Sequence, residues 1–458
     1  MWRMVFEINV AETWIIRNYR EKVNGSMMSD MEMVLKYGTG STVPLRLDPP
    51  ELIGAYGRPR QAALDDPAAA VAAALVDPLD FPPLKMAIAP GDRIALALAD
   101  GLPCAAQLVA GVVASLLEAG AKPEEITVLQ ACQESNTGWP DPRCQLPASV
   151  RRRVSLVTHD PTQRDELGYL AASAAGEPIY VNRVLWDADV VLPIGCLRLE
   201  SHLDYGGAFG GLFPTFSDQA TQQRFRAAGN YRSAKRRQLR LREADEAGWW
   251  LGVSLAIQVV PGPGDSILHV LAGNSGAIYQ RGRRLCREAW YYRSPRRASL
   301  VVAGIEGAAA CQTWENVGRA LAAAMNLVED EGAIAICSDL AAAPGTALLK
   351  ITQAESRDLA YRQIRRERSP DAPTAYQLLR ALEKNKVYLL SRLADEVVEN
   401  LGIAPVENVR QIRRLADCHS TCAVIWNAQY VMTGGEGDGA SDLQQAAGSA
   451  TGIGREDQ

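Results

Sequence analysis

Short apolar runs alternate with longer stretches whose apolar residues recur at helical spacing along most of this chain. Residues 93–98 contain the run Ile-Ala-Leu-Ala-Leu, and residues 105–119 follow with a helical pattern that Gly120 closes. Strands that alternate with helices are typical of βαβ units, and strands that are apolar throughout indicate burial on both faces of a sheet. The pattern therefore predicts an α/β fold with mostly parallel sheets.

Two such series follow each other and predict two lobes, each a mostly parallel sheet flanked by helices. In the first lobe we expect two strands within 33–47, further strands at 93–98, 126–131, 154–158, 179–181, 190–194, 249–260 and 267–270, helices at 66–79, 105–119 and 273–290, and a loop at 49–60. In the second lobe we expect strands at 298–302, 332–337 and 387–391 and helices at 314–327, 357–366 and 374–385. Such lobes usually hold a ligand in the cleft between them, at the carboxyl ends of the strands.

The domain prediction divides the chain into four parts. Residues 31–280 are expected to form the first domain and 281–434 the second. Residues 1–30 carry charged and amide side chains where a signal peptide is apolar, and we expect them to be an N-terminal extension from a misplaced start codon. Residues 435–458 contain almost no large apolar side chain and are expected to be a disordered tail.

Composition bears on the cellular compartment of the protein. The chain has 458 residues, 47 % of them apolar, and a net charge of −5. Its nine cysteines are scattered without a CxxC pair, so we expect reduced, buried thiols in the cytoplasm rather than a structural zinc site. Basic clusters such as Arg151–Arg153 and Lys235–Arg242 are interpreted as solvated helix faces or loops. The net charge is small for a chain of this length and argues neither for nor against a nucleic-acid partner or an anionic membrane surface.

Polar residues that follow predicted strands are the candidates for chemistry, because the carboxyl ends of parallel strands form the ligand edge. Asp100, Cys132–Asn136, His159–Asp160 and Glu200–Tyr205 occupy such positions. In the last segment His202 lies near Asp204, and a carboxylate can orient an imidazole for general acid–base catalysis. A structural histidine beside a tight loop remains the alternative for His202. A glycine cluster that lets backbone approach a phosphate or flat ligand follows at Gly206, Gly207, Gly210 and Gly211.

The other three histidines are expected to be structural. His159 stands in a turn with Asp160, His269 lies within a strand, and His419 lies at a surface turn or helix end. The chain contains no nucleophile elbow, no phosphate-binding P-loop, no H-E-x-x-H motif and no Rossmann glycine fingerprint. The sequence patterns by themselves therefore favour no single reaction.

The order of these segments resembles the nickel-dependent lactate racemase family over residues 31–430. The segments are DPLDFPPLKMAIAPGDRIALALAD, GAKPEEITVLQACQESN, VTHDP, LGYLAASAAGEPIYVNRVLWDADVVLPIGCLRLESH, GGAFGGLFP, ENVGRALAAAMNLVEDEGAIAICSDL and NKVYLLS. The resemblance implies a two-lobed fold and racemisation or epimerisation of a 2-hydroxy acid. The partner it implies is therefore a small carboxylate or hydroxy acid, with no nucleic acid and no membrane. It also implies a nickel pincer nucleotide as cofactor, which takes up hydride from the substrate while histidines move the hydroxyl proton.

Several residues that the resemblance implies for catalysis are replaced in this chain. Of the two histidine bases, one matches His202 and the other is Ser135, which is no base at neutral pH without help. The aspartate of a strand-end motif is kept as Asp100, and we count it with the glycine cluster as cofactor-binding. The lysine that tethers the cofactor falls at Leu212, and the nickel-binding histidine falls near Phe225 and Arg226.

In the second lobe the resemblance implies a substrate-binding amide and cation, and these match Asn316 and Arg319. One hypothesis is an isomerase that uses His202, Ser135 and Asp204, with Glu134 or Glu200 as a further candidate base. A second hypothesis is a non-catalytic relative that binds a carboxylate or nucleotide in the same cleft, as a sensor or partner-binding module. A third is a different reaction on the same scaffold. The missing lysine and histidine put the nickel cofactor in doubt and leave no metal ligand to predict.

Overall fold

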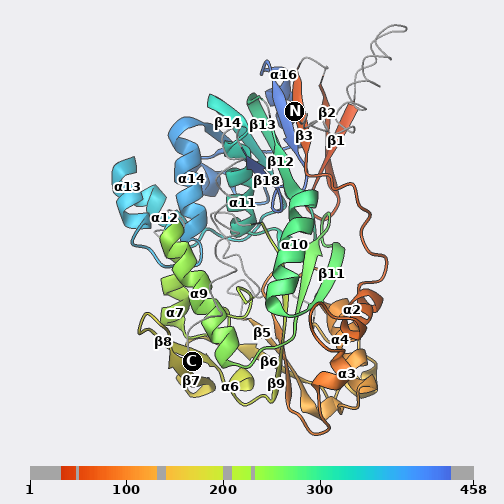
Figure 1. The fold of residues 1–458 in the computed structure, drawn as a ribbon. Coiled ribbons are helices and arrows are strands. Elements are labelled where there is room, and N and C mark those ends of the chain that lie inside the picture. Colours follow the sequence, from red (N-terminus) through yellow and green to blue (C-terminus); the bar gives the residue numbers. More distant parts are fainter. Residues whose placement is uncertain are drawn as a thin grey trace, which may run out of the picture.

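The computed structural model describes residues 32–47, 51–131, 141–199, 209–227, 233–294 and 296–434. Figure 1 shows two lobes, the first below and the second above. The sheet of the first lobe has the strand order β11-β10-β9-β4-β5-β6, and only β10 and β11 pair antiparallel. Its strands are β4 (Ile94–Leu98), β5 (Ile126–Ala131), β6 (Ser155–His159), β9 (Val190–Cys196), β10 (Ala256–Pro261) and β11 (Ile267–Gly273).

Packing on both faces explains why β4 is buried at every position. On one face, Val71 and Leu116 join the core under helices α2 and α4, and on the other, Leu185 and Phe216 pack against Ala97. The helices of this lobe are α2 (Pro67–Val76), α3 (Leu84–Ala87), α4 (Ala105–Glu118), α5 (Ala148–Arg151), α6 (Arg183–Trp186), α7 (Gln219–Arg226), α9 (Ala234–Trp250) and α10 (Ser275–Trp290). The predicted α/β class is confirmed here.

The sheet of the second lobe is parallel throughout and has the order β16-β15-β14-β13-β17-β3. Its strands are β3 (Leu52–Tyr56), β13 (Ala298–Gly304), β14 (Val328–Cys337), β15 (Lys386–Leu390), β16 (Ala404–Val406) and β17 (Cys422–Ile425). Its helices are α11 (Trp314–Met325), α12 (Thr346–Gln353), α13 (Arg357–Ile364), α14 (Ala372–Lys384), α15 (Asp395–Asn400) and α16 (Val409–Asp417), and the short strands β12 (Tyr291–Arg293) and β18 (Met432–Gly434) pair beside them.

The N-terminal strands belong to the second lobe by their packing, although the sequence prediction placed them with the first. The hairpin of β1 (Glu32–Tyr37) and β2 (Ser41–Arg46) buries Leu35 and Val43 against Leu300. The loop predicted at 49–60 was wrong, because β3 lies there and pairs with β17. Within the described residues, β3 pairs with β17 alone, which lies about 370 residues further along the chain. Such a pairing leaves no pattern in the sequence around β3.

A second expectation was wrong at 249–260. Trp249 and Trp250 end helix α9 instead of opening a strand, and β10 begins only at Ala256. Their aromatic side chains are exposed. Aromatic residues favour strands, but here they continue a helix that starts in the basic stretch after Ser233. The Ser233 side chain caps this helix by accepting a hydrogen bond from the backbone N–H of Arg236.

A small subdomain lies at the side of the first lobe. The expected strand at 179–181 is confirmed as β8 (Pro178–Asn182), but it pairs antiparallel with β7 (Leu167–Ala172) and not with the main sheet. Ile179 and Val181 of this hairpin pack against Phe225 of α7 and Ala247 of α9. Within the described residues, no helix is long and apolar enough to cross a membrane.

Candidate functional site

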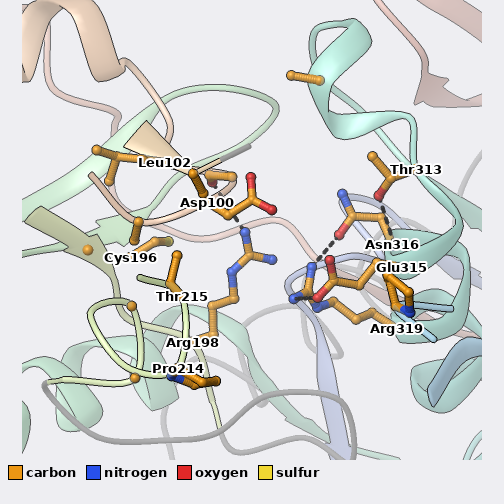
Figure 2. Close-up of a pocket in the computed structure, with 18 of the residues that line it drawn as sticks. Asp100, Leu102, Cys196, Arg198, Pro214, Thr215, Thr313, Glu315, Asn316 and Arg319 are labelled. Carbon is orange, nitrogen blue, oxygen red and sulfur yellow. Dashed lines mark hydrogen bonds and ion pairs between the residues drawn. The ribbon is translucent and has the colours of Figure 1, made fainter. Parts of the chain in front are cut away.

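A cavity of about 350 Å³ opens between the two lobes. Asp100, Arg198 and Arg226 line it from the first lobe, and Glu315 and Arg319 line it from the second. Figure 2 shows Asp100 and Arg198 facing the cluster of Glu315, Asn316 and Arg319 across this space. The predicted cleft between two lobes is therefore present, and its size falls in the usual range for small-molecule pockets.

The ends of neighbouring strands converge on the cavity, as the topology of a parallel sheet requires. Asp100 follows β4, Ala131 ends β5, His159 ends β6 and Cys196 ends β9, and all four line the cavity. The cavity thus lies at the edge of the first sheet that the strand-end argument predicted from the sequence.

The Asp100 carboxyl lies open to the cavity, while protein surrounds that cavity from both lobes. This enclosure raises the pKa of Asp100 to about 6, and the Glu315 carboxylate opposite adds to the rise. The backbone N–H of Gly101 and the guanidinium groups of Arg198 and Arg319 act in the other direction. A carboxyl group with this pKa changes protonation close to neutral pH.

Arg198 is held between the lobes. Its Nη2 donates to the carbonyl oxygen of Gly101 at 3.4 Å, and its guanidinium carbon lies 5.4 Å from the centroid of the Tyr430 ring. Gly101 has φ +64°, a backbone conformation that favours glycine. The Tyr430 hydroxyl in turn donates to the carbonyl oxygen of Gly264 at 3.1 Å. The second lobe therefore helps to place a cation of the first.

The first two turns of α11 present the amide and the cation that the sequence predicted. The Thr313 side chain caps this helix by accepting from the backbone N–H of Asn316. The Asn316 amide donates to the Cys311 carbonyl oxygen at 2.8 Å and accepts from Arg319 Nη1 at 2.7 Å. Arg319 Nη2 donates to Glu315 Oε1 at 2.6 Å. Asn316 thus orients Arg319, whose side chain is only 10 % exposed.

His159 lines the cavity but is structural. Its Nε2 donates to the carbonyl oxygen of Ser217 at 2.9 Å, and its Nδ1 accepts from the Asn182 amide at 3.1 Å. The Asn182 oxygen caps Val184, which fixes the orientation of the amide. Both ring nitrogens of a neutral imidazole are thus occupied, and burial lowers the pKa of His159. The expected non-catalytic assignment agrees with this geometry.

His269 and His419 also have structural partners. His269 Nε2 donates to Gln61 Oε1 at 2.6 Å in the strand β11, and His419 Nδ1 donates to the Leu415 carbonyl oxygen at 2.7 Å after helix α16. Neither lies on the cavity wall formed by the described residues.

Five of the candidate residues lie outside the described residues. They are Ser135, His202, Asp204, Gly206 and Gly207. Their roles remain predictions, as do those of Glu134 and Glu200.

Gly210 and Gly211 end the glycine cluster and line the cavity. A Cβ at Gly211 would lie 2.6 Å from the Cβ of Ala99, so the backbone comes this close to the end of β4 only because residue 211 has no side chain. This glycine permits close backbone packing.

The described residues do not fit the tethered nickel cofactor that the resemblance implies. Leu212, at the position of the tethering lysine, is 2 % exposed and packs with Phe209 and Phe216 in the core. No lysine belongs to the described cavity lining, and no described group of histidine, cysteine and carboxylate side chains could hold a metal. Arg226, near the position of the nickel ligand, carries a cation that coordinates metals poorly.

Comparison with known proteins agrees with the fold. Residues 37–234 match the family model described as the lactate racemase N-terminal domain. Over these residues the chain is similar to the lactate racemase N-terminal domain.

The structure of the lactate racemase apoprotein from Thermoanaerobacterium thermosaccharolyticum superimposes with a TM-score of 0.73 at 16 % identity, over 88 % of this chain and all of that one. A protein from Thermotoga maritima gives 0.60 at 11 % identity, over 82 % of this chain and all of that one. At these identities the two structures show a shared fold. Among curated proteins, none matches this sequence at a significant level.

The sequence prediction missed four charged residues of the cavity wall, namely Arg198, Arg226, Asp265 and Glu315. Arg198 lies two residues after β9, so the same strand-end rule could have found it. Glu315 lies in the first turn of α11, beside residues that were predicted. Arg226 was considered only as the replacement of a metal ligand, and its place on the cavity wall depends on how α7 packs.

Proposed function

We propose that this protein binds a small 2-hydroxy acid, or a closely related carboxylate, in the cleft between its lobes. The observation that carries the proposal is the pair of guanidinium groups that approach one cavity from opposite lobes, Arg198 from the first and Arg319 from the second. Arginine binds carboxylates through two parallel N–H donors, and a partly buried site strengthens such charge-assisted hydrogen bonds.

The ion pair between Arg319 and Glu315 suggests how the ligand enters. The Glu315 side chain is 52 % exposed, whereas that of Arg319 is 10 % exposed and stays fixed through Asn316. A ligand carboxylate can therefore displace Glu315 into water without moving the arginine. The preformed cation keeps the ordering cost of binding low.

Calorimetric titration with lactate tests the proposal. We expect Arg319→Gln to weaken binding about tenfold, because a charge-assisted hydrogen bond is lost. Arg242→Gln is the matched control, since Arg242 is exposed on α9. The proposal fails if lactate and related monocarboxylates do not bind the unaltered protein, or if the control weakens binding as much as the cleft variant does.

The raised pKa of Asp100 favours a second candidate function, the racemisation or epimerisation of the bound acid. A carboxyl group that titrates near pH 6 can accept or donate a proton at the cleft wall. The predicted base His202 would then act with it. Chiral chromatography of single-enantiomer lactate measures this activity.

The variants His202→Ala and Asp100→Asn should each abolish inversion if it occurs. Inversion that persists in both would remove these residues from the mechanism, and binding without any inversion would favour a non-catalytic role. Arg319→Ala should raise the substrate concentration for half-maximal rate.

A further inference from the structure

We infer that the ligand of this cleft carries two acidic groups, a dianion in that sense, and that the second group is a carboxylate or phosphate bound by Arg226. The inference rests on the proposed function, because it takes the first carboxylate to be the one that Arg319 binds. It narrows the ligand class to acids with a second acidic group, which lactate lacks.

The charges on the cavity wall leave Arg226 available. Glu315 pairs with Arg319 at 2.6 Å, and Asp100 lies close enough to Arg198 for the cation to lower its pKa. Within the described residues, Arg226 forms neither a hydrogen bond nor an ion pair, yet it lines the cavity and is half-buried. A positive charge held at a cavity wall without a protein counterion attracts an anion from solution.

The remaining carboxylate on the cavity wall, that of Asp265, interacts with groups other than Arg226. Asp265 interacts with Cys311 and Tyr430, and the Cys104 thiol donates to its backbone carbonyl oxygen. Burial raises the pKa of Asp265, and no arginine contributes to that pKa. Asp265 therefore does not neutralise Arg226.

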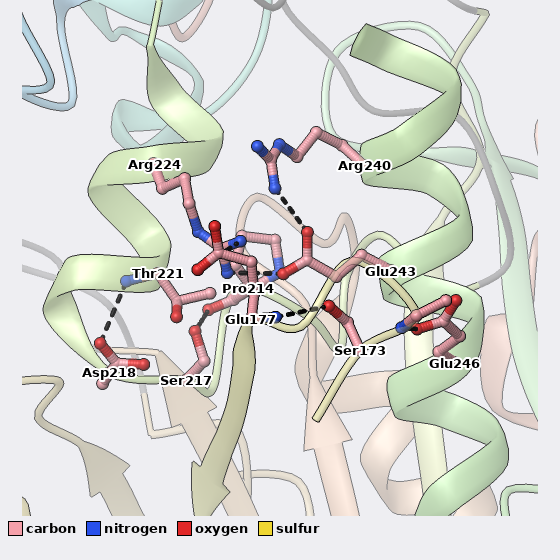
Figure 3. Close-up of polar contacts among 11 residues, drawn as sticks. Ser173, Glu177, Pro214, Ser217, Asp218, Thr221, Arg224, Arg240, Glu243 and Glu246 are labelled. Atoms are coloured by element: carbon pink, nitrogen blue, oxygen red, sulfur yellow. Dashed lines mark hydrogen bonds and ion pairs between the residues drawn. The ribbon is translucent and has the colours of Figure 1, made fainter. Parts of the chain in front are cut away.

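A buried group of charges fixes the helix that carries Arg226. We call Arg224, Arg240 and Glu243 the Glu243 clamp; Figure 3 shows Arg224 and Arg240 approaching Glu243 from two different helices. Arg224 of α7 and Arg240 of α9 each donate to one oxygen of Glu243 at 2.5 Å. Their guanidinium carbons lie 5.7 and 5.2 Å from the centroid of the Phe225 ring.

The Asp218 side chain caps the other end of α7 by accepting from the Thr221 backbone N–H. Because α7 is tied at both ends, Arg226 presents its charge from a fixed backbone. A fixed cation selects ligands by the spacing of their anionic groups.

The volume of the cavity also favours a ligand larger than lactate. A water molecule takes roughly 30 Å³ in the liquid, so a cavity of about 350 Å³ accommodates about a dozen atoms of this size. Lactate would occupy about half of this space. A second acidic group and the carbon atoms that carry it would use the remainder.

Two matched pairs of probes test the inference by calorimetric titration. Lactate and malate share the hydroxy-acid end, and malate adds a carboxylate. Glycerate and 3-phosphoglycerate form the second pair, in which the added group is a phosphate. We expect at least one dianion to bind about tenfold more tightly than its monoanionic partner. The pair with the larger ratio identifies the second group as carboxylate or phosphate.

Variants then assign the second group to Arg226. Arg226→Gln should reduce the affinity of the favoured dianion to that of its monoanion and leave the monoanion unaffected. Arg319→Gln should weaken both members of the pair, and Arg242→Gln should weaken neither. Equal affinities within both pairs, or a dianion preference that survives Arg226→Gln, would overturn the inference while leaving carboxylate binding intact. No binding of any probe would overturn the proposed function with it.

Discussion

The cleft and the Glu243 clamp use the same kinds of residue in opposite ways. In the clamp, the Glu243 side chain is 5 % exposed and both of its oxygens accept from arginines. In the cleft, the Asp100 carboxyl is open to the cavity, its pKa is raised, and Arg226 meets no carboxylate among the described residues. Complete pairing of buried charges serves stability, whereas incomplete pairing beside a cavity leaves charge for a ligand.

The largest effect is expected from Glu243→Ala. Removal of the shared carboxylate leaves two guanidinium groups in a region that water enters poorly, and among the described residues only Arg224 keeps a second carboxylate, that of Glu177 at 3.5 Å. The substitution should cost about 3–5 kcal/mol of unfolding free energy. Urea denaturation followed by tryptophan fluorescence measures this loss. A loss below about 1 kcal/mol would show that the clamp is as well solvated as the cleft.

Gly211→Ala tests how tightly the first-lobe wall of the cleft is packed. The added Cβ would lie 2.6 Å from Ala99, so the backbone must move, at a cost of about 1–3 kcal/mol. Gly276→Ala is the control, because its Cβ would meet only the Asn274 side-chain oxygen, at 3.3 Å. The same denaturation experiment serves for both, and equal stability of the two variants would contradict the close approach.

The pH dependence of binding separates the cleft from the clamp. As pH falls through about 6, Asp100 takes up a proton and no longer repels a carboxylate, so affinity should rise by about three- to tenfold. Asp100→Asn should bind tightly at both pH 7.5 and pH 5.5. Titrations at these two values measure the effect, and a wild-type affinity that does not change with pH would exclude Asp100 from the ligand site.

Stability should respond to the same group with a definite sign. The pKa of Asp100 is raised in the folded state, so folding holds its proton more tightly than the unfolded chain does, and stability falls as pH rises from about 4 to about 6. Asp100→Asn should therefore have the higher melting temperature at pH 7.5 and no advantage at pH 4. The opposite order at pH 7.5 would contradict the raised pKa.

The smallest effect is expected at an exposed ion pair. Arg284 and Glu288 lie 3.7 Å apart on α10 with side chains 67 % and 57 % exposed. Glu288→Ala should change the unfolding free energy by less than about 0.5 kcal/mol, because water and salt screen the pair. A loss similar to that of Glu243→Ala would mean that burial does not explain the difference between the two kinds of charge.

Much of the fold and part of the site could be predicted from local pattern. The apolar runs that became β4, β5 and β13 are buried by sheet and helices, and period and length alone identified them. Asp100 was found because the carboxyl ends of parallel strands meet at one edge. Asn316 and Arg319 came from a resemblance, and the structure places both beside the same cavity.

The remaining features depend on contacts between distant segments. β3 is a strand because β17 offers it a partner, and Trp249 lies in a helix because α9 packs on the hairpin of β7 and β8. Arg226 is a cavity residue because Glu243, seventeen residues further along, holds the helix that carries it. Such effects have no signature at the residue itself.

The amino-acid sequence by itself determined the α/β class and most of the order of the elements, because period and residue type are local properties. Tertiary structure alone decided which charges are paired. Arg224 and Arg226 stand two residues apart on one helix, yet one is paired with a carboxylate and the other faces the cavity. The surroundings of each side chain, and not its chemistry, made that difference.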